Sequence, residues 1–264
     1  MDLKRTLIKL GAILFAGLFC ASAHQVSGWY QDCRQNRQEF EAVEALRGSS
    51  TAAGGLSGSA DDSVQQTILH EYLAIYEANP DFVGWVSIEG TQINYPVLQS
   101  PDDPDFYLKH NFEKQYSAFG TPYMQADCDP LTSDNLLLYG HSMKDGSMFT
   151  NLKKYRSAEF YREHPLIRFD TKYSYGTYEI IAVFSTTADT GGFAYNAFVN
   201  ASDAAEFDAY VAKCKELTAY EIETTAQYGD RLITLSTCEY TQNNGRMVVV
   251  AKLTDKQQTQ NTAI

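Results

Sequence analysis

Positive charge is scarce in this sequence. The 264 residues include 21 Lys and Arg against 33 Asp and Glu, which gives a formal net charge of −12 at pH 7. Three of the basic residues and one acid fall within residues 1–9, so the rest of the chain carries 18 basic and 32 acidic groups, a net charge of −14. A body this acidic repels a phosphate backbone, which excludes nucleic acid as a partner.

Cysteine is also rare. Cys20, Cys33, Cys128, Cys214 and Cys238 form no CxxC pair and show no metal-ligand spacing, which argues against a zinc site or a dithiol redox centre. We therefore expect no cofactor. The count is odd, so at least one thiol has no disulfide partner within the chain. Cys214 lies on the apolar side of a predicted helix and is expected to be in the core.

One apolar run stands near the N-terminus, from Leu10 to Ala23, behind the three basic residues. That order is typical of an export signal. Two outcomes fit it: cleavage at the small residues Ala21-Ser22-Ala23, or retention as a short membrane anchor. We favour the anchor. Residues 1–23 are thus predicted to hold the protein at the cell membrane, with the remaining chain on the extracytoplasmic side.

The remaining chain divides by composition into a linker, a domain and a tail. Residues 24–63 are polar and then rich in Gly and Ser, which predicts a linker, and residues 255–264 form a polar tail. Within the domain, 64–254, helical spacing begins at Val64 and Pro80 ends it, and two further helices are predicted at about 148–163 and 202–219. Eight short segments between turn residues read as strands, at 82–90, 93–99, 120–126, 135–141, 166–171, 177–187, 231–238 and 246–253. Such a pattern predicts a closed barrel or a sandwich.

The predicted strand 231–238, RLITLSTC, ends on a cysteine. Side chains alternate along a strand, so Thr234, Ser236 and Cys238 share a face that becomes polar toward its end. A cysteine in a strand is usually inert packing, whereas a thiol at the end of a polar face is placed for chemistry. If 231–238 and 246–253 form an antiparallel hairpin, Cys238 faces Arg246. Considered by itself, Arg246 would be interpreted as a solvent-exposed charged residue at the edge of the sheet.

His141 is the candidate proton acceptor for that thiol. It closes the predicted strand 135–141, NLLLYGH, directly after a glycine, where its ring is free to face a groove. The more common role of such a residue is that of a hydrogen-bonded structural imidazole. The other four histidines fall in the signal region, on a helix face, in a charged loop and before a proline, and need no catalytic role.

Together these segments resemble a known family. TLSTC (Thr234–Cys238) with Arg246 downstream, and NLLLYGHSM (Asn135–Met143), look like the two signature strands of the sortases, and the long helix before the cysteine strand is similar to class B. The resemblance covers roughly residues 64–254. It implies a mainly β fold, an eight-stranded sortase-type barrel with an N-terminal helix and a helix before the cysteine strand. It also implies a catalytic trio of His141, Cys238 and Arg246.

The implied activity is that of a cysteine transpeptidase of Gram-positive bacteria. Class B membership implies cleavage after Thr in a sorting peptide of the type Asn-Pro-x-Thr-(Asn/Gly/Ser), followed by transfer to a peptidoglycan cross-bridge amine. The chemistry is consistent with the residue types: a thiolate attacks the carbonyl, an imidazole moves the proton, and a guanidinium stabilises the oxyanion.

Substrate recognition and the acceptor are left open by the residues. Ser236 and Glu239 flank the nucleophile and are candidate substrate-binding residues, although a strand hydroxyl bonded to a neighbour and an ordinary turn acid would look the same. The Gly-containing stretch 185–198 lies in a region that helps to wall the peptide groove in this family. Three other functions compete: a cysteine hydrolase, a different cysteine transpeptidase acting on peptidoglycan, and a non-catalytic surface binding module. The second usually has His and Cys close in sequence, whereas here 97 positions separate them.

Overall fold

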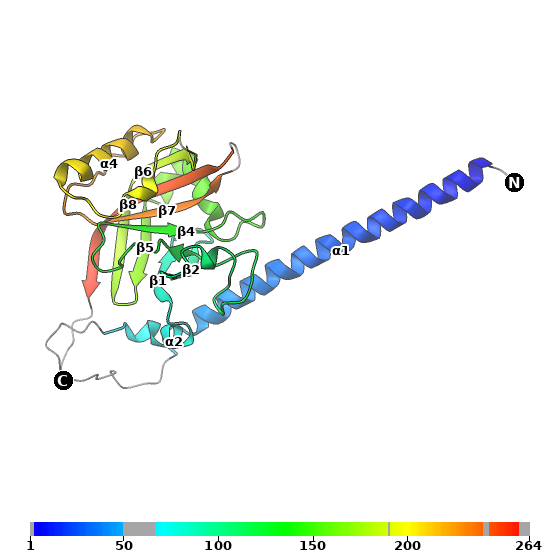
Figure 1. Ribbon diagram of the computed structural model, residues 1–264, viewed down its shortest axis with the longest axis horizontal. Helices are drawn as coiled ribbons and strands as arrows, with labels where there is room; N and C mark the ends of the chain where they lie inside the picture. The colour runs from blue at the N-terminus through cyan, green and yellow to red at the C-terminus, as the bar shows by residue number, and fades with distance from the viewer. Residues whose placement is uncertain (1–2, 50–66, 190, 240–242, 259–264) are drawn as a thin grey trace. The chain divides into compact units, whose positions relative to one another are not determined.

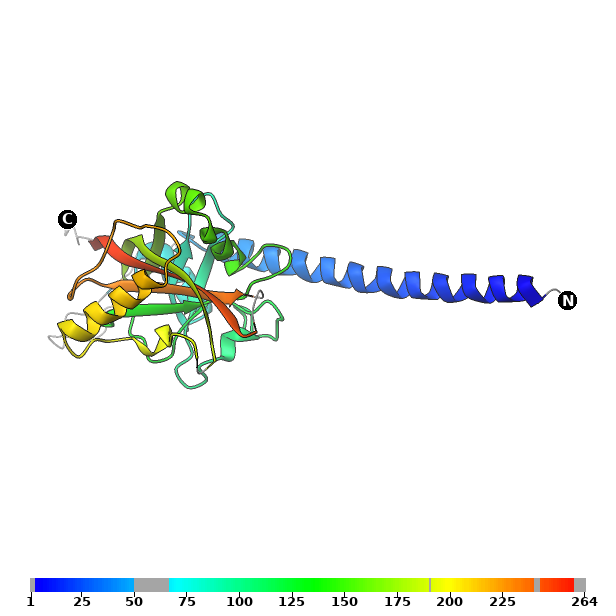
Figure 2. The same ribbon diagram turned by 90° about the horizontal axis from the view of Figure 1, so that it is seen from above.

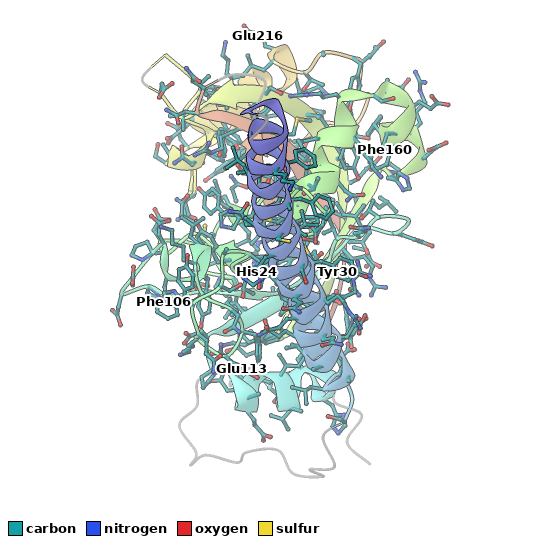
Figure 3. All side chains as sticks on the ribbon, turned by 90° about the vertical axis from the view of Figure 1, so that its right-hand side faces the viewer. His24, Tyr30, Phe106, Glu113, Phe160 and Glu216 are labelled. Atoms are coloured by element: carbon teal, nitrogen blue, oxygen red, sulfur yellow. The ribbon has the colours of Figure 1, made fainter. Side chains whose placement is uncertain are left out.

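The computed structural model describes residues 3–49, 67–189, 191–239 and 243–258. The chain divides into two compact units, Met1–Ala42 and Val43–Ile264. Most of the first unit is helix α1 (Leu3–Ala45), an uninterrupted helix of 43 residues that carries His24 and Tyr30 (Figure 3). Residues 24–45 of the predicted linker are therefore helical, and its positions 50–63 lie outside the described residues.

The predicted membrane anchor is wrong. No helix within the described residues is both long and apolar enough to cross a membrane. The physical reason is the length of the apolar run, because the 14 residues from Leu10 to Ala23 make a helix of only about 21 Å at about 1.5 Å per residue, against a hydrocarbon core of about 30 Å. Within the run, Gly, Ala and Ser contribute little hydrophobicity. The expected localisation at the cell membrane is withdrawn with it.

Eight strands form the second unit and close into a barrel (Figures 1 and 2). In space they follow the order β1-β2-β3-β4-β7-β8-β6-β5. Their bounds are Phe82–Ser87 (β1), Asn94–Leu98 (β2), Tyr123–Met124 (β3), Asn135–Tyr139 (β4), Leu166–Thr171 (β5), Ser174–Thr187 (β6), Leu232–Glu239 (β7) and Gly245–Gln258 (β8). Each corresponds to a strand predicted from the sequence, so the mainly β fold and the eight-stranded barrel are confirmed and the sandwich is excluded.

Helical elements of the second unit precede the first strand or fill connections between later strands. They are α2 (His70–Ala78), α3 (Ala158–Glu163), α4 (Ala204–Glu216) and the 3-10 segments η1 (Phe106–Leu108), η2 (Phe149–Arg156) and η3 (Tyr195–Ala197). Helix α4, the predicted helix before the cysteine strand, begins after Asp203, whose side chain accepts a hydrogen bond from the Glu206 N–H, and it packs against β6. The helix expected at 148–163 is divided at Ser157, which has an extended backbone and caps α3 through its side chain.

Strand β8 is longer than the sequence pattern indicated. It continues five residues past Leu253, because Ser174–Thr177 of β6 pair with it as far as Gln258. Polar residues at these positions hid the strand, since alternation between an apolar and a polar face weakens where a strand pairs beyond the core.

A buried polar cluster joins α2 to the barrel. Tyr72 is fully buried and donates a hydrogen bond of 2.8 Å from its hydroxyl to Asp170 Oδ2. Arg47 lies against the rings of Tyr72 and Trp85, 5.2 and 5.1 Å from their centroids, and donates to the Tyr72 hydroxyl at 3.1 Å. Burial raises the pKa of Asp170, although donation from Tyr72 and from the Gly176 N–H acts in the opposite direction.

The buried carboxyl predicts a pH dependence of stability. Since the folded pKa of Asp170 is raised, its contribution to stability is complete below the unfolded pKa of about 4 and is lost as pH rises through the folded value. We expect the free energy of unfolding of the wild type minus that of Asp170→Asn to decrease as pH rises above about 4. Urea denaturation, followed by tryptophan fluorescence at each pH, measures this difference in the free energy of unfolding. A difference that is constant or increases with pH would contradict the prediction.

Candidate active site

Strand β7 carries its hydroxyl side chains in hydrogen bonds rather than in solvent. Thr234 is fully buried and donates to Asn135 Oδ1 at 2.9 Å, while Ser236 is 2% exposed with its Oγ 2.7 Å from the Tyr195 hydroxyl. Tyr195 comes from η3, and Tyr210 of α4 lies 3.4 Å from Thr234 Oγ1. Tyrosines therefore cover the polar face of this strand. Two residues beyond Ser236 the same face reaches Cys238, which is only partly buried.

The hairpin of β7 and β8 has the register predicted from the sequence. Cys238 pairs with Arg246, Ser236 with Val248 and Thr234 with Val250. Side chains of directly paired residues lie on the same face, with Cβ atoms about 4.5 to 5.5 Å apart. The Arg246 guanidinium donates through Nη1 to the carbonyls of Gly245 at 3.0 Å and Asn244 at 3.3 Å. These bonds to its own turn hold the cation at the cysteine end of the hairpin.

The strand that precedes His141 runs parallel to β7 and beside it. The two strands pair from Asn135 with Leu232 to Tyr139 with Ser236, so that two residues further along each chain stand His141 and Cys238. Further hydrogen bonds hold the backbone next to these two residues in place. The Gly140 N–H donates to the Ser236 carbonyl at 3.2 Å, and Thr237 Oγ1 donates to the Gly140 carbonyl at 2.7 Å. The parallel pairing of β4 with β7, two neighbouring strands in Figure 1, therefore brings the residues that follow the paired segments to the same end of the barrel.

Gly140 is required at its position by packing. A Cβ atom built there would lie 2.6 Å from the ring of Phe149, the first residue of η2. The N–H of Phe149 also donates to the His141 carbonyl at 2.9 Å. The glycine of the Tyr-Gly-His sequence therefore lets η2 close on the backbone of His141 and hold it in place.

The imidazole of His141 has a defined partner. Its Nε2 atom lies 2.7 Å from the carbonyl oxygen of Leu108, in η1. A carbonyl oxygen can only accept, so Nε2 carries a hydrogen and the neutral ring has its lone pair on Nδ1. The nitrogen that remains for proton transfer is Nδ1.

Two tyrosines lie within the electrostatic reach of both Cys238 and Arg246. The pKa of Tyr123 is raised, first by burial and then by the carboxylate of Asp105, with Cys238 raising it further and Arg246 lowering it. The pKa of Tyr195 is also raised by burial, against the hydrogen bond with Ser236 and the charge of Arg246. Sequence reasoning missed both side chains. Their signals were a tyrosine in the short third strand and one in the stretch 185–198.

The two predicted recognition residues are differently placed. Ser236 is buried beneath Tyr195, so its hydroxyl contacts the tyrosine. Glu239 is the last residue of β7 and its Cα pairs with Gly245, whereas its side chain lies outside the described residues.

The remaining thiols lie in other surroundings. Cys128, Cys214 and Cys238 form no disulfide within the described residues. Cys214 is fully buried, as predicted, and burial raises its pKa to about 12. Cys128 is buried behind β4, where its sulfur is 3.5 Å from the Leu137 N, and burial raises its pKa to about 11. Buried neutral thiols are poor nucleophiles. Cys238, in contrast, is only partly buried and is paired with Arg246 across the hairpin.

A thiol, an imidazole and a guanidinium at one edge can support acyl transfer through a thioester. The thiolate attacks a carbonyl carbon, the imidazole moves the proton of the leaving and entering groups, and the guanidinium offers donors to an oxyanion.

Comparison with known proteins agrees with this chemistry. A family model described as the sortase domain matches residues 86–254. Sortase B of Listeria monocytogenes is 30% identical over 259 residues, which cover 97% of this chain and 100% of the relative. The crystal structure of sortase B from Bacillus anthracis superposes with a TM-score of 0.71 at 30% identity, over 86% of this chain and 99% of the other.

A third similarity is to a structure that contains substrate. The Staphylococcus aureus sortase B–substrate complex has a TM-score of 0.71 at 26% identity and covers 85% of this chain and 99% of the other. From the family match over residues 86–254 and the similarity across nearly the whole chain, it follows that this protein belongs to the sortase family as a class B member and is a cysteine transpeptidase.

Proposed function

We propose that Cys238 is the nucleophile of this transpeptidase, His141 its general acid and base, and Arg246 the donor to the oxyanion. The observation that supports the assignment is the ladder of β4, β7 and β8, whose registers bring these three residues to one end of the barrel. The partly buried state of Cys238, in contrast to Cys128 and Cys214, agrees with it.

The reaction has two steps with complementary proton movements. The Cys238 sulfur attacks the carbonyl carbon of Thr in the sorting peptide, a C–S bond forms, and the C–N bond breaks as His141 gives its proton to the departing amine. An incoming amine then attacks the thioester carbonyl while His141 takes its proton, a new C–N bond forms, and the C–S bond breaks to release the Cys238 thiolate. Arg246 stabilises the tetrahedral oxyanion in both steps.

Sortases act on sorting-signal peptides and cell-wall amines. For this chain we propose a peptide of the type Asn-Pro-x-Thr-(Asn/Gly/Ser) as acyl donor and a peptidoglycan cross-bridge amine as acceptor. Ser236 would act on the peptide through Tyr195, because its hydroxyl is bonded to that tyrosine. Glu239, next to the nucleophile in sequence, is proposed to contact the peptide or the amine.

Removal of the nucleophile tests the thioester. Incubated with Asn-Pro-x-Thr-x peptides, the full chain is expected to gain the mass of the acyl fragment on Cys238, and Cys238→Ala to gain none and to lose turnover by about 10⁴-fold. Addition of triglycine or a diaminopimelate-type amine should convert the adduct to amide. Mass spectrometry follows both. Cleavage that ignores the amine would indicate a hydrolase, and no adduct with any peptide would contradict the proposal.

Substitution of the arginine tests the oxyanion role. Arg246→Lys keeps the charge and loses the planar fork, so we expect kcat to fall by about 10²-fold with KM for the peptide nearly unchanged. Arg168→Lys on β5, with a side chain that is 61% exposed, is the matched control. Steady-state kinetics with a fluorogenic peptide measures both. An effect confined to KM would place Arg246 in peptide binding instead.

A further inference from the structure

Within the described residues, the imidazole of His141 is hydrogen-bonded to the Leu108 carbonyl, whose oxygen lies 2.7 Å from Nε2. Whatever fixes that oxygen also fixes the tautomer of the ring and the direction of Nδ1. The oxygen belongs to η1, on the segment between β2 and β3 that carries Phe106 (Figure 3).

Neighbouring carbonyls of this segment are each bonded, which makes the turn rigid. His110 Nδ1 lies 2.6 Å from the Phe106 carbonyl oxygen. The rings of Phe106 and His110 are stacked, with their centroids 3.9 Å apart and an interplanar angle of 4°. The Tyr107 carbonyl accepts from the Thr121 N–H at 2.9 Å, and the His110 carbonyl accepts from Thr121 Oγ1 at 3.1 Å. Thr121 therefore holds the backbone of residues 107–110 in place through two hydrogen bonds.

Gly120, directly before Thr121, lies close to the Leu108 oxygen. Its φ of +60° is in the left-handed region, and a Cβ atom built there would stand 2.7 Å from the Leu108 oxygen, 3.0 Å from its carbonyl carbon and 2.6 Å from the Tyr107 oxygen. Atoms this close to a backbone carbonyl force it to move. Since the affected oxygen is the one that holds His141, a side chain at position 120 would shift the imidazole.

We propose that Gly120 is a positioning residue for His141, which keeps the Leu108 carbonyl aligned with Nε2 and so directs Nδ1 toward the reacting groups. The proposal rests on the role proposed above for His141. His110 supports it from the other end of the turn through its bond to the Phe106 carbonyl.

The chain offers a matched control for backbone strain. Gly229 has a φ of +98°, also in the left-handed region, and nothing lies within 4 Å of a Cβ built there. Alanine at either site imposes a left-handed backbone on a residue with a Cβ, but only at position 120 does it press on the Leu108 oxygen. A difference between Gly120→Ala and Gly229→Ala thus reports on that contact.

The experiment compares both variants as full chains with the wild type. In peptide transfer to triglycine, we expect Gly120→Ala to lower kcat by about 10–100-fold with KM for the peptide within about twofold, as for a catalytic group displaced by about 1 Å. Gly229→Ala is expected to retain the wild-type kcat and KM. Equal kcat values for the two variants at similar thermal melting temperatures would overturn the proposal.

A spectroscopic measurement tests the contact itself. Nitrogen-15 NMR of histidine-labelled protein, with His141→Gln to assign the signal, is expected to show the Nε2–H tautomer in the wild type and a mixture in Gly120→Ala. An Nδ1–H tautomer in the wild type would overturn the proposal. If Gly120→Ala does not fold, His110→Phe, which keeps the stacking and removes the N–H, must lower kcat; wild-type kcat in that variant would reject it.

Failure of this inference can be told from failure of the proposed function. If His141→Gln transfers peptide as well as the wild type, the role of His141 is wrong and the inference falls with it. If His141→Gln is inactive while Gly120→Ala matches Gly229→Ala, only the positioning role of Gly120 is wrong.

Discussion

The site depends on one constraint, which is the register of strand β7 against both of its neighbours. With β4 it pairs in parallel from Asn135 to Tyr139, and with β8 it pairs antiparallel so that Cys238 meets Arg246. Side chains alternate with a period of two, so a slip of one residue in either ladder would turn the cysteine away from its partners. Buried hydrogen bonds resist that slip, because Thr234 is bonded to Asn135 and Thr237 to Gly140 across the β4 side.

The Thr and Ser hydroxyls before Cys238 have a structural role, although their pattern in the sequence suggested a catalytic one. The Thr and Ser residues before Cys238 predicted a strand face that becomes polar toward the cysteine, whereas the structure uses their hydroxyls to bind tyrosines of η3 and α4 and the backbone of β4. An unpaired buried hydroxyl costs about 1–3 kcal/mol, so each of these bonds favours the native register over its neighbours. Polarity here serves specificity of pairing, and it is Cys238, beyond these hydroxyls, that reaches a partly open surface.

Local patterns predicted the strands and the β7–β8 register, because both follow from alternation and from a short hairpin loop. They could not predict that β4 lies beside β7, since 97 positions separate His141 from Cys238 and no periodicity links the two. The His141 contact was equally out of reach. Its acceptor is a backbone carbonyl of Leu108, and any residue at that position supplies one. Gly120 opened the predicted strand 120–126, and nothing in the sequence indicated that it approaches Leu108. The anchor failed for a different reason, because charge order and apolar composition suggested a span that its length does not support.

The surroundings of the cysteines were likewise not evident from the neighbouring sequence, because they depend on contacts between distant parts of the chain. Cys128 and Cys238 both stand near strands of the barrel wall, and sequence context alone gave no position for the first. Burial raises the pKa of Cys128 to about 11 and leaves a neutral thiol at neutral pH, with its sulfur 3.5 Å from a backbone amide. Cys238 lies opposite a guanidinium on a partly open face. Since the thiolate is the reactive form, the role proposed for Cys238 rests on this open face and on the guanidinium that the fold places across the ladder.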